Sequence, residues 1–165
     1  MTKLTERTQS QQSELDVHIV ERPACRVQAL RHYGPASAIA QTYEKMRAYI
    51  GKRTVETWFG IVQGDSDAEN GFVYHAAVSG LGEKLAHPDM ELLNIAGGCY
   101  ASHTLVGPYQ QISTTMEALY TKWLPQSAFE ADDRPAVEWY LNSPEDTAQE
   151  NLRTNLLIPV RRAGI

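Results

Sequence analysis

The chain has 165 residues, of which 42% are hydrophobic and 21% charged, the usual composition of a globular protein large enough for one domain with a sizeable core. Its formal net charge of −5 argues against direct nucleic-acid binding and weakly favours neutral or cationic partners. No apolar run is long enough to cross a membrane, and the two distant cysteines are expected to be reduced thiols. The first residues are polar and lack a signal-peptide core, so we expect a flexible tail over 1–14, one domain over 15–165 and a cytoplasmic location.

The first half of the chain predicts a helix flanked by strands. Gly34 and Pro35 suit the start of the helix, and Gly51 suits its end. Apolar residues between them recur at spacings of four, three and four, which places them on one side of a helix and predicts that they are core. Strand-like runs lie before and after this helix, at residues 25–31, 57–62 and 72–78.

A polar loop over residues 63–71 joins the last two of these strands. Its acidic residues superficially resemble a calcium-binding loop, but Gly71 falls one place late and Ala76 occupies the position of the bidentate glutamate. We therefore interpret it as a hairpin loop. Because the histidines also lack metal-ligand spacing and no glycine-rich phosphate loop is present, we expect no metal site and no cofactor.

The second half repeats this pattern at an offset of 73 residues. Gly107 and Pro108 repeat the first Gly-Pro pair, and Pro125 is expected to stop the second helix. The helical stripes correspond in order: Ile39 with Ile112, Tyr43 with Met116, Met46 with Leu119, and Ile50 with Trp123. The second set of strand-like runs covers residues 99–105, 136–141 and 154–160.

The repeat predicts an α+β fold built from two pseudo-symmetric β-α-β-β units, about 15–79 and 97–161, with a connector over 79–97. One such unit is too small to bury both its sheet face and its helix. We therefore expect one antiparallel sheet with the helices on one side and a cleft where the units meet, which is a common place for a ligand pocket.

One predicted strand, within residues 134–142, carries an acid at its centre. Side chains alternate along a strand, so Val137, Trp139 and Leu141 are expected to share a core face, while Glu138 and Tyr140 share the other. A carboxylate is disfavoured in a strand and costly to bury. An acid beside a phenol ring could line a pocket for a cation, although an ordinary surface glutamate is an equally good interpretation of the strand alone.

Aromatic residues are placed on the predicted strands or at the two helix starts. Core packing is the better explanation for each one alone, but together with Glu138 they could form an aromatic box that attracts flat cations. Burial would raise the pKa of the empty carboxyl group and a bound cation would lower it. A histidine near Glu138 would make an acid/base pair, and His75 and His103, which lie on predicted strands, are the two candidates. The candidate ligand-binding residues are Glu138, Tyr140, Tyr33, Trp58, Tyr74, Tyr100, Tyr109 and His103.

The order of several motifs resembles the GyrI-like effector-binding domain family. These motifs are residues 98–101 leading to 107–109, the pair 123–124, residues 135–140 and the ending 157–160. The resemblance covers about residues 15–161 and implies a similar fold. The family includes the stand-alone DNA gyrase inhibitory protein and the drug-binding domains of AraC-type and MerR-type regulators.

The resemblance also implies a role for Glu138. In drug-binding members, an acid on the strand that matches residues 136–140 lies at the floor of the cleft and meets cationic aromatic ligands. Some stand-alone members are similar in fold and hydrolyse small reactive electrophiles with that glutamate and a nearby tyrosine. This sequence contains no helix-turn-helix segment before the domain, so the resemblance supports a detached binding module.

Three functions remain open from the sequence. The first is a stand-alone binding module for lipophilic, cationic aromatic compounds. The second is a small hydrolase in which Glu138 acts with Tyr140, Tyr100 or His103. The third is a protein-interaction module like the gyrase inhibitor, whose surface contacts a protein partner.

Overall fold

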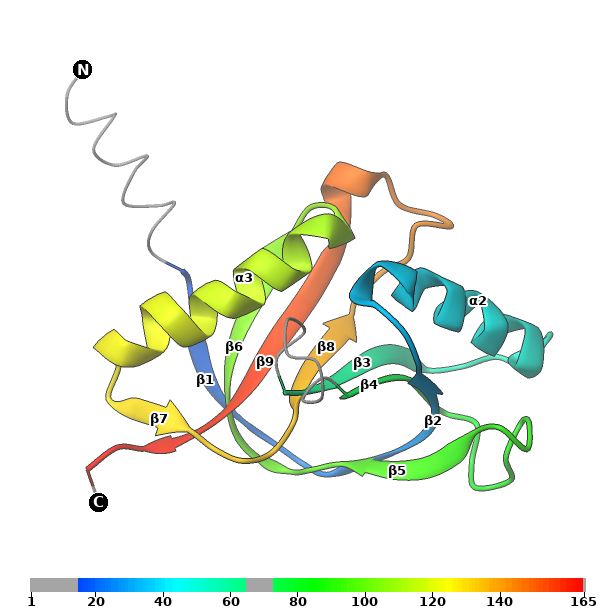
Figure 1. Ribbon diagram of the computed structural model, residues 1–165, viewed down its shortest axis with the longest axis horizontal. Helices are drawn as coiled ribbons and strands as arrows, with labels where there is room; N and C mark the ends of the chain where they lie inside the picture. The colour runs from blue at the N-terminus through cyan, green and yellow to red at the C-terminus, as the bar shows by residue number, and fades with distance from the viewer. Residues whose placement is uncertain (1–14, 65–72, 165) are drawn as a thin grey trace.

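The computed structural model describes residues 15–64 and 73–164. This part of the chain forms two α-helices and a curled antiparallel sheet of nine strands, which confirms the predicted α+β class (Figure 1). The expected N-terminal tail and residues 65–71 of the expected hairpin loop lie outside the described residues.

The predicted β-α-β-β repeat is present in both halves. The first unit consists of β2 (Cys25–His32), a short turn η1 (Ala36–Ala38), α2 (Ile39–Ile50), β3 (Thr57–Gln63) and β4 (Val73–Ser79). The second consists of β6 (Gly98–Val106), η2 (Tyr109–Gln111), α3 (Ile112–Ala118), β8 (Ala136–Tyr140) and β9 (Arg153–Arg162). Further short elements are β1 (His18–Arg22), β5 (Glu91–Ile95), η3 (Leu119–Trp123), η4 (Leu124–Gln126), β7 (Phe129–Ala131) and η5 (Gln149–Asn151).

The strand order shows how the two units join. The sheet runs β1-β6-β9-β8-β3-β4-β2-β5, with β7 also paired to β9. Read outward from the centre, β3-β4-β2-β5 and β8-β9-β6-β1 are equivalent sets, so β3 and β8 form the seam between the units. The edge strand β5 falls within the predicted connector, and β1 pairs with β6 of the second unit. Sequence reasoning found neither edge strand, because neither sequence alternates apolar and polar residues as a half-buried strand usually does.

The two helix starts differ slightly from expectation. Pro35 and Pro108 have an extended backbone, with ψ of 159° and 153°, so each precedes a short 3₁₀ turn instead of lying in the first helical turn. Gly51 ends α2 at a φ of 66°, a conformation that glycine adopts readily. The second helix widens into a π-helical turn, η3, and finishes in a 3₁₀ turn that contains Pro125.

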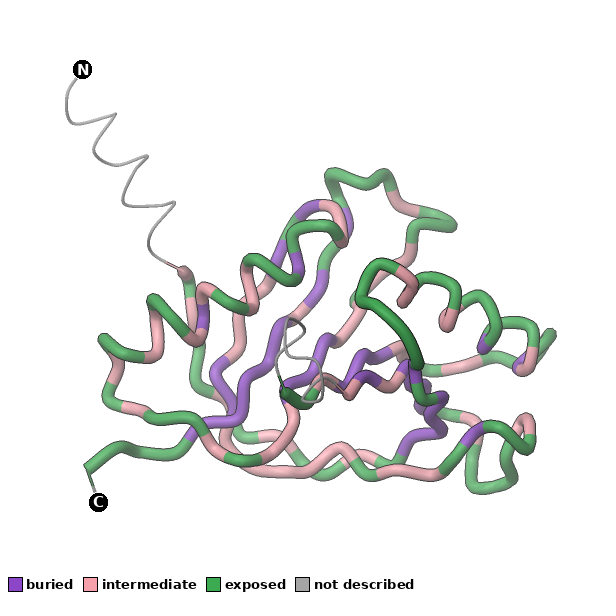
Figure 2. Tube along the Cα trace, viewed as in Figure 1, coloured by how far each residue is buried: buried purple, intermediate pink, exposed green. Residues whose placement is uncertain are grey.

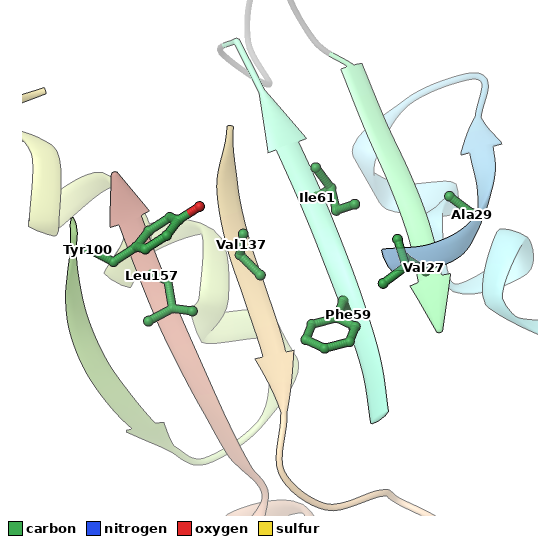
Figure 3. Packing of buried hydrophobic residues seen from close by; sticks show 8 residues of the cluster. Val27, Ala29, Phe59, Ile61, Tyr100, Val137 and Leu157 are labelled. Atoms are coloured by element: carbon green, nitrogen blue, oxygen red, sulfur yellow. The ribbon is translucent and has the colours of Figure 1, made fainter. Parts of the chain in front are cut away.

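Both faces of the sheet are buried. On one face α2 and α3 each cover an apolar cluster, centred on Met46 and Leu119. The opposite face curls on itself and buries residues from six strands, including Phe59, Tyr100 and Val137 (Figure 3). Figure 2 accordingly shows the buried positions concentrated on the central strands. The central strands can therefore hold a polar side chain on the face covered by the helices without exposing it to solvent.

The face assignment along β8 is largely correct. Val137 is buried in the cluster of the curled face, and Trp139 packs against that cluster while remaining partly exposed. Leu141 follows the end of β8 and is 44% exposed, so its assignment to the core was wrong. It lies where the chain leaves the sheet for the β8–β9 loop, beyond the cover of neighbouring strands.

Candidate functional site

Glu138 lies at the centre of the sheet, on the face covered by the helices. It is the middle residue of β8, directly opposite Gly60 of β3 and Leu156 of β9. The seam between β3 and β8 therefore runs beside it, with α2 above one unit and α3 above the other (Figure 1). Glu138 is 8% exposed, so the competing interpretation as a surface acid is excluded.

Three tyrosines surround the carboxylate. The hydroxyl groups of Tyr74 and Tyr140 both donate to Glu138 Oε1, at 2.7 and 2.6 Å. Tyr43 reaches down from α2, and its hydroxyl group lies 2.7 Å from that of Tyr74 and donates to the Phe59 carbonyl at 2.9 Å. We call Glu138, Tyr43, Tyr74 and Tyr140 the tyrosine cluster. It connects α2, β4 and β8, and hence both units.

A glycine makes room for this cluster. Gly60 faces Glu138 across the seam, and a Cβ atom at this position would overlap the Tyr74 hydroxyl group and Glu138 Oε1. Any larger residue at position 60 would therefore displace the groups that hold the carboxylate. The glycine, which is otherwise unfavourable inside a strand, fits a close approach of polar groups.

The second carboxylate oxygen remains available. Glu138 Oε2 accepts no hydrogen bond from any described residue. Thr154 Oγ1 is the only fully enclosed side-chain polar atom without a partner in the described part of the chain, so Oε2 keeps some contact with solvent. The tyrosines thus fix one oxygen and leave the other for a ligand or a proton.

Burial dominates the electrostatics of the cluster. It raises the pKa of Glu138, and the hydrogen bonds from Tyr140 and Tyr74 oppose only part of that rise. Burial also raises the pKa of Tyr74 and Tyr140 well above the usual value, and the nearby Glu138 charge adds to this effect. The phenols therefore stay protonated as donors, while the carboxyl group can change its charge on binding.

Aromatic rings form a rim around the cluster. The Tyr43 ring lies 6.0 Å from Trp58, and the Tyr140 ring lies 5.2 Å from Tyr109 at a steep angle. Beside Tyr109, η2 and the β8–β9 loop form a pocket of about 310 Å³, lined also by Gln110, Pro144, Thr147, Gln149 and Leu152. The rim offers aromatic ring faces of the kind that a cation contacts.

The structure brings four of the predicted aromatic residues to Glu138 or its rim. Tyr74 and Tyr140 bind the carboxylate, whereas Trp58 and Tyr109 belong to the rim.

The remaining predicted residues lie elsewhere. Tyr100 points to the opposite face of the sheet, where its hydroxyl group donates to the Ala96 carbonyl (Figure 3). Tyr33 is 78% exposed beside Arg31. His103 lies two strands from Glu138, roughly 9–10 Å away, and its Nδ1 pairs with the backbone at Asp16. These placements follow from the strand order and from which face each strand presents. Sequence alone provided neither.

Sequence reasoning missed Tyr43 as a site residue. Its position in the apolar stripe of α2 predicted core packing, and the ring is indeed partly buried against that core. The usable signal was the repeat itself, because the corresponding residue of the second unit is Met116. The hydroxyl group of Tyr43 therefore has no counterpart at the matching position of the second unit.

The structure is an α+β domain with a buried, hydrogen-bonded carboxylate at the seam between two repeated units. The chain belongs to the GyrI-like small molecule binding domain family, whose profile matches residues 9–161. The described residues contain no helix long and apolar enough to span a membrane, and no group of three or more potential metal ligands.

Solved structures share this fold at low sequence identity. The C-terminal domain of EcmrR matches with a TM-score of 0.71 and 15% identity, over 90% of this chain and 99% of that domain. The chain spans 65% of the longer EcmrR chain seen with DNA. SAV2435 bound to tetraphenylphosphonium matches with a TM-score of 0.65 and 12% identity, over 89% of this chain and 94% of that one. A hydrolase from Listeria innocua matches with a TM-score of 0.59 and 15% identity, over 95% and 98% of the two chains.

Proposed function

We propose that this protein binds lipophilic aromatic cations at Glu138. The observation that supports this most directly is the buried carboxylate, with Oε1 held by two phenols and Oε2 left without a partner among the described residues. A cation at Oε2 would replace the solvation that burial has removed from the acid. A neutral ligand would leave the unfavourable charge in place, so the site discriminates by charge.

The aromatic rim supplies the second part of the affinity. Trp58, Tyr109 and Tyr140 present ring surface around the carboxylate. Each good cation–π contact contributes on the order of 1–2 kcal/mol when it is desolvated. Because Glu138 is 8% exposed, rim side chains must shift before a large ligand reaches Oε2. The adjacent pocket of about 310 Å³ beside Tyr109 could accept part of such a ligand.

Tetraphenylphosphonium, which is present in the SAV2435 structure, is a suitable probe because tetraphenylborate has nearly the same shape and the opposite charge. We expect the protein to bind the phosphonium and to bind the borate or neutral triphenylphosphine oxide much more weakly. Glu138→Gln keeps the side-chain shape but removes the charge, and is expected to weaken phosphonium binding by about 1–2 kcal/mol, roughly tenfold. Isothermal titration calorimetry measures each affinity.

The matched control is Glu130→Gln, which removes an exposed acid that pairs with Arg161 away from the site. This change has the same effect on net charge and is expected to leave phosphonium affinity within about twofold, since a surface charge is screened by salt. If both variants weaken the phosphonium equally, or if Glu138→Gln weakens all three probes alike, Glu138 does not select cations and the proposal is wrong.

A hydrolase is the second candidate, and the arrangement of Glu138 with two phenol donors favours it. A carboxyl group with a raised pKa can serve as a general base or acid. The Tyr74 and Tyr140 hydroxyl groups donate to Oε1 in the free protein, and after the carboxyl group takes up a proton they can turn to donate to a developing negative charge. An activated ester and an epoxide would serve as model electrophiles. The hydrolase would be favoured over the binding module if the wild-type protein turns over one of these compounds and Glu138→Gln abolishes that turnover while retaining the affinity for an unreactive analogue.

A further inference from the structure

Arg47 places a positive charge at the rim of the candidate site. It lies four residues after Tyr43 on α2, and therefore one turn further along the same face of the helix. Its guanidinium carbon is 5.2 Å from the centre of the Trp58 ring. The protein thus already holds a cation against one of the aromatic surfaces that a cationic ligand would use.

A second contact joins Arg47 to the other repeated unit. Its Nε lies 3.7 Å from Glu145 Oε1, in the loop between β8 and β9. Glu145 lies in the same loop as Pro144 and Thr147, which line the pocket beside Tyr109, so this ion pair joins α2 to the loop that forms the pocket. The Arg47 and Glu145 side chains are 43% and 74% exposed. Such an exposed pair is easily opened.

We propose that Arg47 is a built-in competitor for the cation site: it covers Trp58 in the free protein, and a bound cation takes its place on the ring. This inference rests on the proposed function and adds a means of regulation to it. Glu145 gives the displaced guanidinium a partner, so Arg47 can leave the ring without losing its ion pair. The apparent affinity for a cation is then reduced by the fraction of molecules in which Arg47 occupies the ring.

Arg47→Gln tests this proposal because glutamine retains polarity but not the charge. We expect the variant to bind tetraphenylphosphonium roughly twofold to fivefold more tightly, the range of an exposed cation–π contact, and tetraphenylborate more weakly. Arg47→Lys retains the charge and is expected to stay within about twofold of the wild-type protein for both probes. Affinities are measured by calorimetry at fixed ionic strength, after the thermal unfolding of each variant has been checked.

Arg26 provides a closely matched control. It pairs with Glu83 at 3.6 Å, with side-chain exposures of 49% and 73%, and is located on β2 away from the cluster. Arg26→Gln therefore makes the same change in net charge and breaks the same kind of ion pair. It is expected to change neither affinity by more than about twofold, because long-range effects of surface charges are screened.

The outcomes separate this inference from the proposed function. If Arg47→Gln behaves like Arg26→Gln while Glu138→Gln still weakens the phosphonium, competition by Arg47 is overturned and the cation site stands. If Arg47→Gln and Arg47→Lys raise the phosphonium affinity equally, the charge of Arg47 is not responsible and the inference is again overturned. If Glu138→Gln has no effect on the phosphonium, both proposals fail.

Discussion

Gly60→Ala is expected to destabilise the protein by about 2–3 kcal/mol and to reduce phosphonium affinity by up to about tenfold, the loss expected when the Glu138 charge is removed. The added Cβ would overlap the Tyr74 hydroxyl group and Glu138 Oε1, so the hydrogen bonds that orient the carboxylate must break or the strands must separate. At an ordinary strand position the same substitution stabilises a protein by roughly 0.5–1 kcal/mol, because alanine loses less backbone entropy than glycine. A loss of stability would therefore indicate the overlap, whereas a gain would indicate an ordinary strand position. Chemical denaturation measures stability, and calorimetry measures binding.

A double-mutant cycle identifies the cause of that loss. Tyr74→Phe removes the hydroxyl group, the nearest atom that the new methyl group would meet, while Glu138 Oε1 and the Tyr74 ring remain in place. If the overlap is responsible, Gly60→Ala will cost measurably less stability in the Tyr74→Phe background than in the wild-type protein. Additive effects of the two changes would mean that they act independently and that overlap with the Tyr74 hydroxyl group is not the cause of the loss.

The fold could be predicted because its signals are local. The Gly-Pro corners and the helical stripes repeat at one offset, and each of them is encoded within a few residues of the chain. The edge strands β1 and β5 were not predictable in this way. Their sequences show no alternation of apolar and polar residues, and each becomes a strand by pairing with β6 or β2 at an edge of the sheet.

The site was predictable where it depends on one strand and not where it depends on contacts between strands. Glu138 and Tyr140 share a face because they are two residues apart on β8. Tyr100 was assigned to the same site, yet its strand presents it to the opposite face, and only the register through β9 reveals this. Arg47 and Glu145 are brought together from separate units, so no local pattern relates them.

Glu138→Gln is expected to make the protein more stable at neutral pH, by about 1–3 kcal/mol, the usual range for a buried polar group with incomplete compensation. Burial raises the pKa of Glu138, so the folded protein keeps a proton that an unfolded glutamate has released. Stability of the wild-type protein therefore falls as pH rises from the ordinary glutamate pKa of about 4.5 through the higher folded value. Glutamine has no such proton, so the greater stability of the variant should disappear below about pH 4.5, where the wild-type glutamate is protonated in both the folded and the unfolded state.

Thermal or denaturant unfolding across pH 4 to 8 measures this difference, with Glu130→Gln as the exposed control. A variant that loses stability relative to the wild-type protein as pH rises would mean that the folded carboxylate is favoured, the opposite of the effect of burial. The same linkage predicts that phosphonium binding releases a proton within this pH range, because a bound cation lowers the pKa of Glu138. Calorimetry in two buffers of different ionisation enthalpy detects that proton, and Glu138→Gln should eliminate it. Proton release that persists in the variant would assign the coupling to another group.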